Sequence, residues 1–183
     1  KAKFVFLPTL LHELTHLKSD EEIEAMAKAG ELVVKSFEAL VSAAKPGNYE
    51  YQLEAAAVHA IMNGGGKPHF MIIGSTSMSD PKLIFPNPRP SARVLKKGDI
   101  ILTEMVAAYK GYTAKIGHPV TIGKPTPEVA SFFKRVVVPG YKGIEAALKP
   151  GNALEEVRKA GAHFRQQGAQ SRPIITHGLD LIT

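Results

Sequence analysis

The chain has 183 residues, 44% of them hydrophobic, which is enough for one domain with a sizeable core, or one domain plus part of another. It contains no cysteine, so disulfides and thiolate metal sites are excluded and a cytoplasmic location is expected. No apolar run approaches the ~20 residues of a membrane span. The formal charge of +6 is scattered, and no segment combines basic charge with stacking aromatics, so neither a membrane nor a nucleic-acid partner is expected.

The first residues are expected to lie outside the main domain. A short apolar run, Phe4 to Leu7, is typical of the end of a strand, and Pro8 then opens a short helical segment. We interpret residues 1–17 as a linker or the tail of an N-terminal domain, and residues 18–183 as the main domain.

Two helices are predicted next. Ser19 and Glu22 form a capping box, which opens a helix that Lys45-Pro46-Gly47 ends. Its apolar stripe, at spacings of three and four residues, consists of Ile23, Met26, Gly30, Val33, Phe37, Leu40 and Ala44. Asn48 is expected to cap a second helix, which ends at Asn63-Gly64-Gly65-Gly66. The apolar face of this second helix consists of Leu53, Ala56, Ala57, Ala60 and Ile61.

A predicted β-hairpin at 95–123 is central to the functional argument. It follows a Ser-, Pro- and Asn-rich loop at 74–94, and loops of this length are uncommon unless they are functional or mobile. With a two-residue turn at Tyr109-Lys110, Glu104 and Lys115 lie opposite each other on one face of the sheet. We therefore predict a cross-strand ion pair between these two side chains.

The rest of the chain is predicted to be mainly helical. Thr126 caps a third helix, which Pro139-Gly140 interrupts. Asn152 and Glu155 form another capping box, which opens a helix that runs to about Gln166.

A short internal repeat divides the chain into two similar parts. The segment Lys45-Pro46-Gly47-Asn48 recurs as Lys149-Pro150-Gly151-Asn152, offset by 104 residues, and each copy lies between two predicted helices. This pattern predicts pseudo-symmetric halves in an α+β fold, with helices packed on one face of a curved, mostly antiparallel sheet. The second half is expected to continue with strands after Thr183, so a C-terminal part is expected to be missing.

The segment His12-Glu13-Leu14-Thr15-His16 matches the zinc-peptidase pattern HExxH. On a helix, His12 and His16 share one face and can both ligate zinc, with Glu13 as general base. The predicted helix has only about two to three turns at ~3.6 residues per turn. Glu31 is the one nearby candidate for a third ligand, so a chance match is favoured over a zinc site.

Two other histidines are candidates for a site near the hairpin. His118 lies on the second hairpin strand, just before Pro119, and could face the same cavity as Glu104, or lie on the surface. His177 lies between Thr176 and Gly178, where glycine allows close approach of backbone or ligand. His59, His69 and His163 are interpreted as structural residues.

The order of these motifs resembles that of the creatinase/aminopeptidase family, whose fold is known as pita-bread. The resemblance covers about residues 17–183. It rests on Lys18-Ser19 with Glu22-Ile23, the two Lys-Pro-Gly segments, Leu95-Lys96-Lys97-Gly98-Asp99, Tyr109-Lys110-Gly111-Tyr112, Gly123 and His177-Gly178. It implies a pita-bread domain of catalytic type at 18–183, here truncated.

The resemblance also implies a metal site that this sequence does not match. In that family, two Asp on the hairpin, one His and two later Glu hold two divalent metals that activate a water. The Asp positions correspond here to Glu104 and Lys115, and the His to His177, whereas the Glu positions lie beyond Thr183. A further active-site His corresponds to Asn87. An ammonium at Lys115 repels a divalent cation and cannot ligate while protonated, so no metal and no other cofactor is expected.

Three functional hypotheses remain open, and so does the question whether the chain is an enzyme. The first is a hydrolase of peptide or amide C–N bonds that is metal-independent or inactive. The second is a pseudoenzyme that binds a small molecule or short peptide, and the third is the HExxH zinc peptidase. The catalytic candidates are His177, His118, Glu104 and Lys115, and the substrate-binding candidates are Asn87 and Tyr112. A homodimer also stays open, since dimers are common in the resembling family.

Overall fold

The structure is a computed structural model that describes residues 4, 8–83, 86 and 88–169. The described chain divides into two compact units, the first ending at Gly123 and the second beginning at Lys124. Each unit is described by itself. None of the helices within the described ranges is both long enough and apolar enough to cross a membrane.

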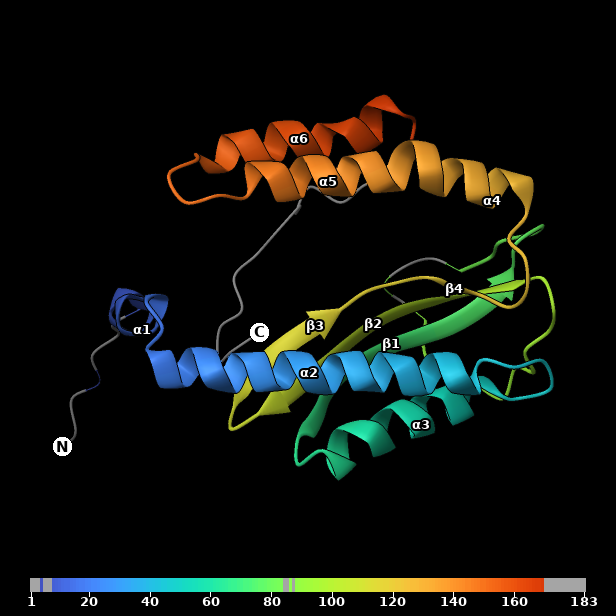
Figure 1. The fold of residues 1–183 in the computed structure, drawn as a ribbon, viewed down its shortest axis with the longest axis horizontal. Coiled ribbons are helices and arrows are strands. Elements are labelled where there is room, and N and C mark those ends of the chain that lie inside the picture. The colour runs from blue at the N-terminus through green and yellow to red at the C-terminus, as the bar shows by residue number, and fades with distance from the viewer. Residues whose placement is uncertain (1–3, 5–7, 84–85, 87, 170–183) are drawn as a thin grey trace. The chain divides into compact units, whose positions relative to one another are not determined.

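The first unit combines three helices with an antiparallel sheet (Figure 1). The helices are α1 (Pro8–His16), α2 (Asp20–Ala43) and α3 (Glu50–Asn63). The strands are β1 (Lys67–Ser77), β2 (Asp99–Tyr109), β3 (Tyr112–Ile116) and β4 (Val120–Thr121). The strand order is β1-β2-β3, and β4 pairs with β2 beyond the end of β3. The predicted α+β architecture with an antiparallel sheet is confirmed.

The core of this unit lies between α2, α3 and one face of the sheet (Figure 1). Its fully buried side chains include Leu32, Leu40, Leu53, Ile61, Ile73, Ile101 and Met105. On α2 the buried residues are Ala25, Ala29, Leu32, Val33, Ser36 and Leu40. The predicted stripe was therefore wrong at Ile23, which is 53% exposed. Two neighbouring stripes satisfy the same spacing, and the helix buries the one whose alanines allow close packing.

The ends of α2 and α3 match the prediction in part. The Ser19–Glu22 capping box is present and confirms the predicted start of α2. Asn48 is not the N-cap of α3, because Tyr49 occupies that position. The Asn48 side-chain amide instead donates to the carbonyl of Ala43, at 2.8 Å, and so closes the end of the preceding helix.

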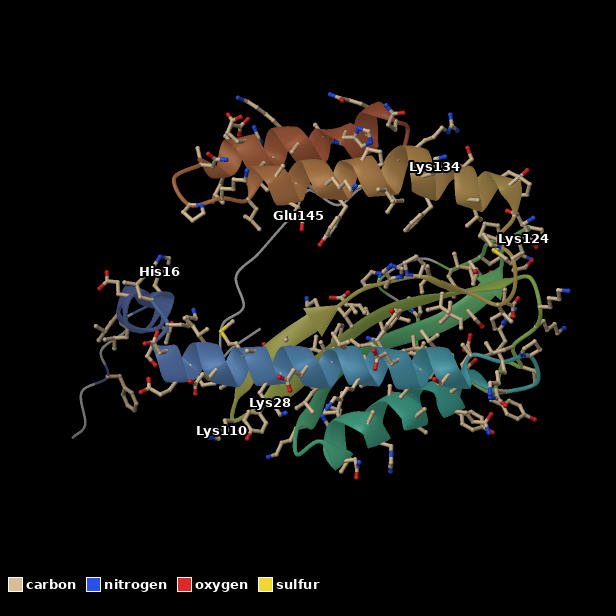
Figure 2. The ribbon with its side chains drawn as sticks, viewed as in Figure 1. His16, Lys28, Lys110, Lys124, Lys134 and Glu145 are labelled. Carbon is tan, nitrogen blue, oxygen red and sulfur yellow. The ribbon has the colours of Figure 1, made fainter. Side chains whose placement is uncertain are left out.

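The hairpin between β2 and β3 turns one residue later than predicted. Its turn residues are Lys110 and Gly111, with φ of 49° and 89°, a combination typical of a type I′ turn (Figure 2 labels Lys110). Glycine reaches positive φ without strain, which favours Gly111 within the turn. As a result Lys115 pairs with Val106, and the prediction that it pairs directly with Glu104 is wrong.

The second unit is helical over its described residues. It contains α4 (Pro127–Phe132), the π-helix η1 (Phe133–Val137), α5 (Val138–Ala147) and α6 (Leu154–Gln166). The Thr126 cap is confirmed, since its hydroxyl accepts from the backbone N–H of Val129. The predicted interruption at Pro139-Gly140 is wrong. Proline lacks an N–H and crowds the carbonyl four residues back, and the wider π-helical turn before Pro139 accommodates it without a break.

The turn between α5 and α6 also differs from the prediction. The N-cap position of α6 is Ala153, and no side chain caps it, so the predicted capping box of Asn152 and Glu155 is wrong. The amide of Asn152 donates to the carbonyl of Ala147, at 2.9 Å. Both Asn residues of the internal repeat therefore close the helix that precedes them.

Candidate ligand-binding site on the sheet

The predicted ion pair lies on the face of the sheet that α2 and α3 do not cover. Residues two apart on a strand share a face, so Val106 and its partner Lys115 lie on the same face as Glu104. The Lys115 Nζ lies 2.9 Å from the Glu104 Oε1, in a diagonal cross-strand arrangement. The ion pair is therefore confirmed, although its register differs from the prediction.

Apolar neighbours partly shield this pair from solvent. The side chain of Glu104 is 19% exposed and that of Lys115 is 30% exposed. Ile72, which pairs with Glu104 on β1, and Val106 are both buried. In such a setting, the carboxylate can accept hydrogen bonds from donor groups of a ligand. The ammonium can donate hydrogen bonds to its acceptor groups.

His118 lies on the other side of the sheet from this pair. Its ring contacts the ring of Phe37 on α2, with centroids 5.6 Å apart, and Phe37 packs against the core. Its backbone N–H and carbonyl both bind the hydroxyl of Thr103. Since Thr103 and Glu104 are consecutive strand residues, they face opposite sides. The structure therefore does not bring His118 together with Glu104.

Tyr112 also faces the helix side. It pairs with Tyr109 across the turn, and its hydroxyl donates to the Glu22 carboxylate of α2, at 2.7 Å. This bond raises the pKa of Tyr112, and the pKa of Glu22 lies below its ordinary value because the Ser19 backbone N–H and the Tyr112 hydroxyl both donate to it. The Tyr112 hydroxyl thus connects the hairpin to the start of α2. Its predicted role in substrate binding stays a prediction.

Two of the predicted site residues, His177 and Asn87, lie outside the described residues. The HExxH segment does form the helix α1, and His16 is exposed at its end (Figure 2). Within the described part of the chain, no group of three or more His, Cys, Asp or Glu is placed to hold a metal. The side chain of His12 lies outside the described part of the structure, so the zinc site of the HExxH segment stays a prediction.

A buried charged network that the sequence did not reveal lies at the start of α3. Glu50 is 3% exposed, and its carboxylate accepts four hydrogen bonds, from the N–H and hydroxyl of Ser75 and of Ser91. Arg93 donates to the Ser75 hydroxyl and binds Asp99 with both guanidinium nitrogens, at 2.7 and 2.9 Å. The one available sequence signal was Asp99, which belongs to the Leu95–Asp99 motif.

This network holds Asp99 in its ionised form. Burial alone raises the pKa of a carboxyl. Hydrogen bonds from the Arg93 guanidinium and the Lys96 backbone N–H, together with the positive charges of the Arg93 and Lys96 side chains, bring the pKa of Asp99 below its ordinary value. The pKa of Arg93 is raised, chiefly by its hydrogen bonds to Asp99. The network joins α3, β1, β2 and the preceding loop.

A cavity of about 410 Å³ opens beside this network. Its wall combines residues of α3, of β1 and of the loop between β1 and β2. They are Glu50, Gly74, Ser75, Lys82, Leu83, Pro88, Arg89, Ser91 and Arg93.

Residues 24–182 match metallopeptidase family M24, and the chain belongs to this family. It is 30% identical over 175 residues to a methionine aminopeptidase of Clostridium acetobutylicum, covering 89% of this chain and 67% of that relative. It is 27% identical over 157 residues to an Xaa-Pro dipeptidase of Pyrococcus furiosus, covering 85% of this chain and 44% of the relative. The chain thus spans less than half the length of that dipeptidase.

The fold is also that of solved peptidases. The X-Pro aminopeptidase of Thermotoga maritima superposes with a TM-score of 0.77 over 91% of this chain and 47% of that one, at 24% identity. This likeness confirms the predicted pita-bread fold. At the two hairpin positions where the resemblance implies metal-binding carboxylates, this chain has Glu104 and Lys115, whose side chains bind each other.

Proposed function

We propose that this chain binds a short peptide or another small molecule on the sheet face of Glu104 and Lys115, without the two-metal hydrolysis of the family. The observation that supports the proposal is the 2.9 Å contact between the Lys115 ammonium and the Glu104 carboxylate. A pair of hard cations needs several carboxylates close together. At this position one expected carboxylate is a cation, and the other is bound to it.

The pair suits recognition of a peptide or amide. Lys115 offers donors to a carbonyl or carboxylate, and Glu104 offers acceptors to an N–H or an amine. The relatives named Xaa-Pro dipeptidase and X-Pro aminopeptidase favour a ligand with a peptide bond to proline, and we adopt Ala-Pro as the probe. Exchange of one ion-pair contact for a ligand contact keeps both charges partnered.

Metal-independent cleavage of a C–N bond is a second candidate. It is favoured by the same contact, since a carboxylate beside an ammonium is an arrangement in which a proton can be taken up by one group and delivered by the other. In this reaction Glu104 would accept a proton from the attacking water, and Lys115 would donate one to the leaving nitrogen.

Metal content tests the proposal directly. The purified chain is incubated with Co²⁺, dialysed and examined by elemental analysis, and we expect far less than one ion per chain. Lys115→Asp restores a second carboxylate and should bind Co²⁺ more tightly than the wild type. Lys28→Asp on the exposed surface of α2 makes the same charge change away from the site and should not (Figure 2). Two ions per wild-type chain would overturn the proposal.

Ala-Pro binding and cleavage separate the two candidate functions. Calorimetry in the presence of EDTA should show saturable binding that Lys115→Met weakens at least about tenfold, the loss expected for a hydrogen bond to a charged group. Release of proline in EDTA that disappears in Glu104→Gln would favour the hydrolase, and absence of any binding would reject both. The cytoplasmic location and the homodimer remain predictions.

A further inference from the structure

The wall of the cavity beside β1 does not include Glu104 or Lys115. It brings together charged side chains from α3 and from the loop that follows β1, whereas Leu83 and Pro88 supply an apolar part. The absence of a side chain at Gly74 allows Pro88 to approach β1 closely, since a Cβ at this position would lie 2.6 Å from the Cβ of Pro88. A volume of about 410 Å³ is within the range of small-molecule sites.

The negative charge on this wall is already satisfied. The Oε1 atom of Glu50 accepts hydrogen bonds from the N–H and hydroxyl of Ser75, and Oε2 accepts them from the N–H and hydroxyl of Ser91. Glu50 also acts on Arg93 as a nearby opposite charge, and its side chain is almost completely buried. Glu50 therefore has no unfilled acceptor to offer a cationic ligand.

The positive charges on the wall are satisfied to different degrees. Arg93 binds Asp99 with both nitrogens of its fork. Lys82 binds Asp80, but the two side chains are 77% and 68% exposed, so this pair is weak and readily exchanged. Arg89 differs from both, because among the described residues it contacts no carboxylate.

Arg89 is nevertheless held in place by the loop. Its Nη1 donates to the carbonyls of Pro86 and Pro88, at 3.3 and 2.9 Å. These two contacts use one nitrogen and leave the Nε and Nη2 donors without a described partner. The remaining edge of the guanidinium is the fork that binds a carboxylate through two parallel hydrogen bonds.

We propose that this cavity is a binding site for a small organic carboxylate, with its carboxylate on Arg89 and Lys82 and its apolar part against Leu83 and Pro88. The site does not use Glu104 or Lys115, and it stands whether or not the function proposed above is correct. The buried network of Glu50, Arg93 and Asp99 fixes the wall on which the ligand rests.

Benzoate and benzamide test this site as a matched pair, because they have nearly the same shape and differ in charge. Each is titrated into the ¹⁵N-labelled chain, and shifts of the Gly74 and Ser75 amides and of the Arg89 Nε–H are followed. We expect benzoate to shift these signals with saturation and benzamide to bind at least about tenfold more weakly, as for loss of a charge-assisted hydrogen bond. Inorganic phosphate should bind more weakly than benzoate, since it gains nothing from the apolar wall.

Variants show which side chain is responsible. Arg89→Gln should weaken benzoate binding at least about tenfold, and Arg89→Lys should restore it only in part because the fork is lost. Arg135→Gln removes the same charge from the second unit, where Arg135 binds Ser131, and should leave binding unchanged. Lys115→Met should also leave it unchanged, which separates this site from the ion pair. Equal binding of benzamide or phosphate, an unchanged Kd in Arg89→Gln, or no saturable shift would each overturn the proposal.

Discussion

Two helix pairs in this molecule are joined by segments of identical sequence, Lys-Pro-Gly-Asn, and these segments form the same turn. In the first unit, Lys45–Asn48 joins α2 to α3, and in the second, Lys149–Asn152 joins α5 to α6. The glycine of each turn has positive φ, 93° at Gly47 and 87° at Gly151. In both turns the Asn amide donates to the carbonyl five residues before it, at 2.8 and 2.9 Å. The turn is therefore determined by its own sequence.

The two pairs differ in the surroundings of the first residue of the second helix. The first residue of α3 is Glu50, which is 3% exposed and bonded to β1 and the loop before β2. The residue at the same place in α6 is Leu154, which is 75% exposed. Identical turns thus lead to a buried carboxylate in one unit and an exposed leucine in the other, which shows that burial depends on partners distant in the sequence.

The largest expected effect comes from substituting this first helical residue. Glu50→Ala leaves two buried donors on Ser75 and two part-buried donors on Ser91 without their acceptor, and it should lower the free energy of unfolding by about 3–5 kcal/mol. Leu154→Ala should change it by less than about 0.5 kcal/mol, since the side chain is exposed. Urea unfolding followed by circular dichroism measures both. Similar losses for the two variants would show that the helix pairs are not distinguished by this position.

Acid should destabilise the first unit more than the second, because of Asp99. Its pKa is lowered in the folded state, so its ionised form stabilises the first unit above the unfolded pKa of about 3.9. This stability is lost as pH falls below about 4 through the folded pKa, and the loss should be on the order of 1.5–3 kcal/mol for a carboxylate bonded to a charged partner. In the second unit, Glu155 also has a lowered pKa but is exposed beside Arg158, and its contribution should be small.

Hydrogen exchange distinguishes the units in this experiment. The amide of Ser75 reports on the first unit, and that of Leu148, which donates to Ile144, reports on the second. Protection of Ser75 should fall with acid much more than that of Leu148. Asp99→Asn should remove most of this pH dependence, and an equal decline in both amides in the wild type would contradict the assignment to Asp99.

Sequence reasoning succeeded where the determinants are local and failed where they are not. The Ser19 capping box and the Thr126 cap need only neighbouring residues, and both are present. The family resemblance likewise located Glu104 and Lys115 at one site. The turn position was missed by one residue, because both Tyr109-Lys110 and Lys110-Gly111 fit the hydrophobic pattern and only backbone conformation separates them.

The candidate site shows the same limit. His118 was predicted either to face the cavity of Glu104 or to lie on the surface, but strand alternation and its contact with α2 put it on the opposite face. Tyr112, a substrate-binding candidate, lies on that same face, where it binds Glu22. The role of Glu50 could not be predicted, since a glutamate in the first turn of a helix is ordinarily exposed. Its burial depends on Ser75 and Ser91, which lie 25 and 41 residues away.

The smallest expected effects test whether the repeated turn is equivalent in the two units. Asn48→Ala and Asn152→Ala each remove one side-chain bond to a helix-terminal carbonyl. We expect a loss of about 1 kcal/mol at Asn48, whose bond is partly buried, and about 0.5 kcal/mol at Asn152, whose bond is exposed. Gly47→Ala and Gly151→Ala are matched controls, because a Cβ at either position meets no atom within 4 Å and both have positive φ. Their losses, measured by urea unfolding, should be equal at about 1 kcal/mol, since only backbone conformation is strained. If the glycine variants differ while the Asn variants agree, the two turns respond to their surroundings rather than to their common sequence.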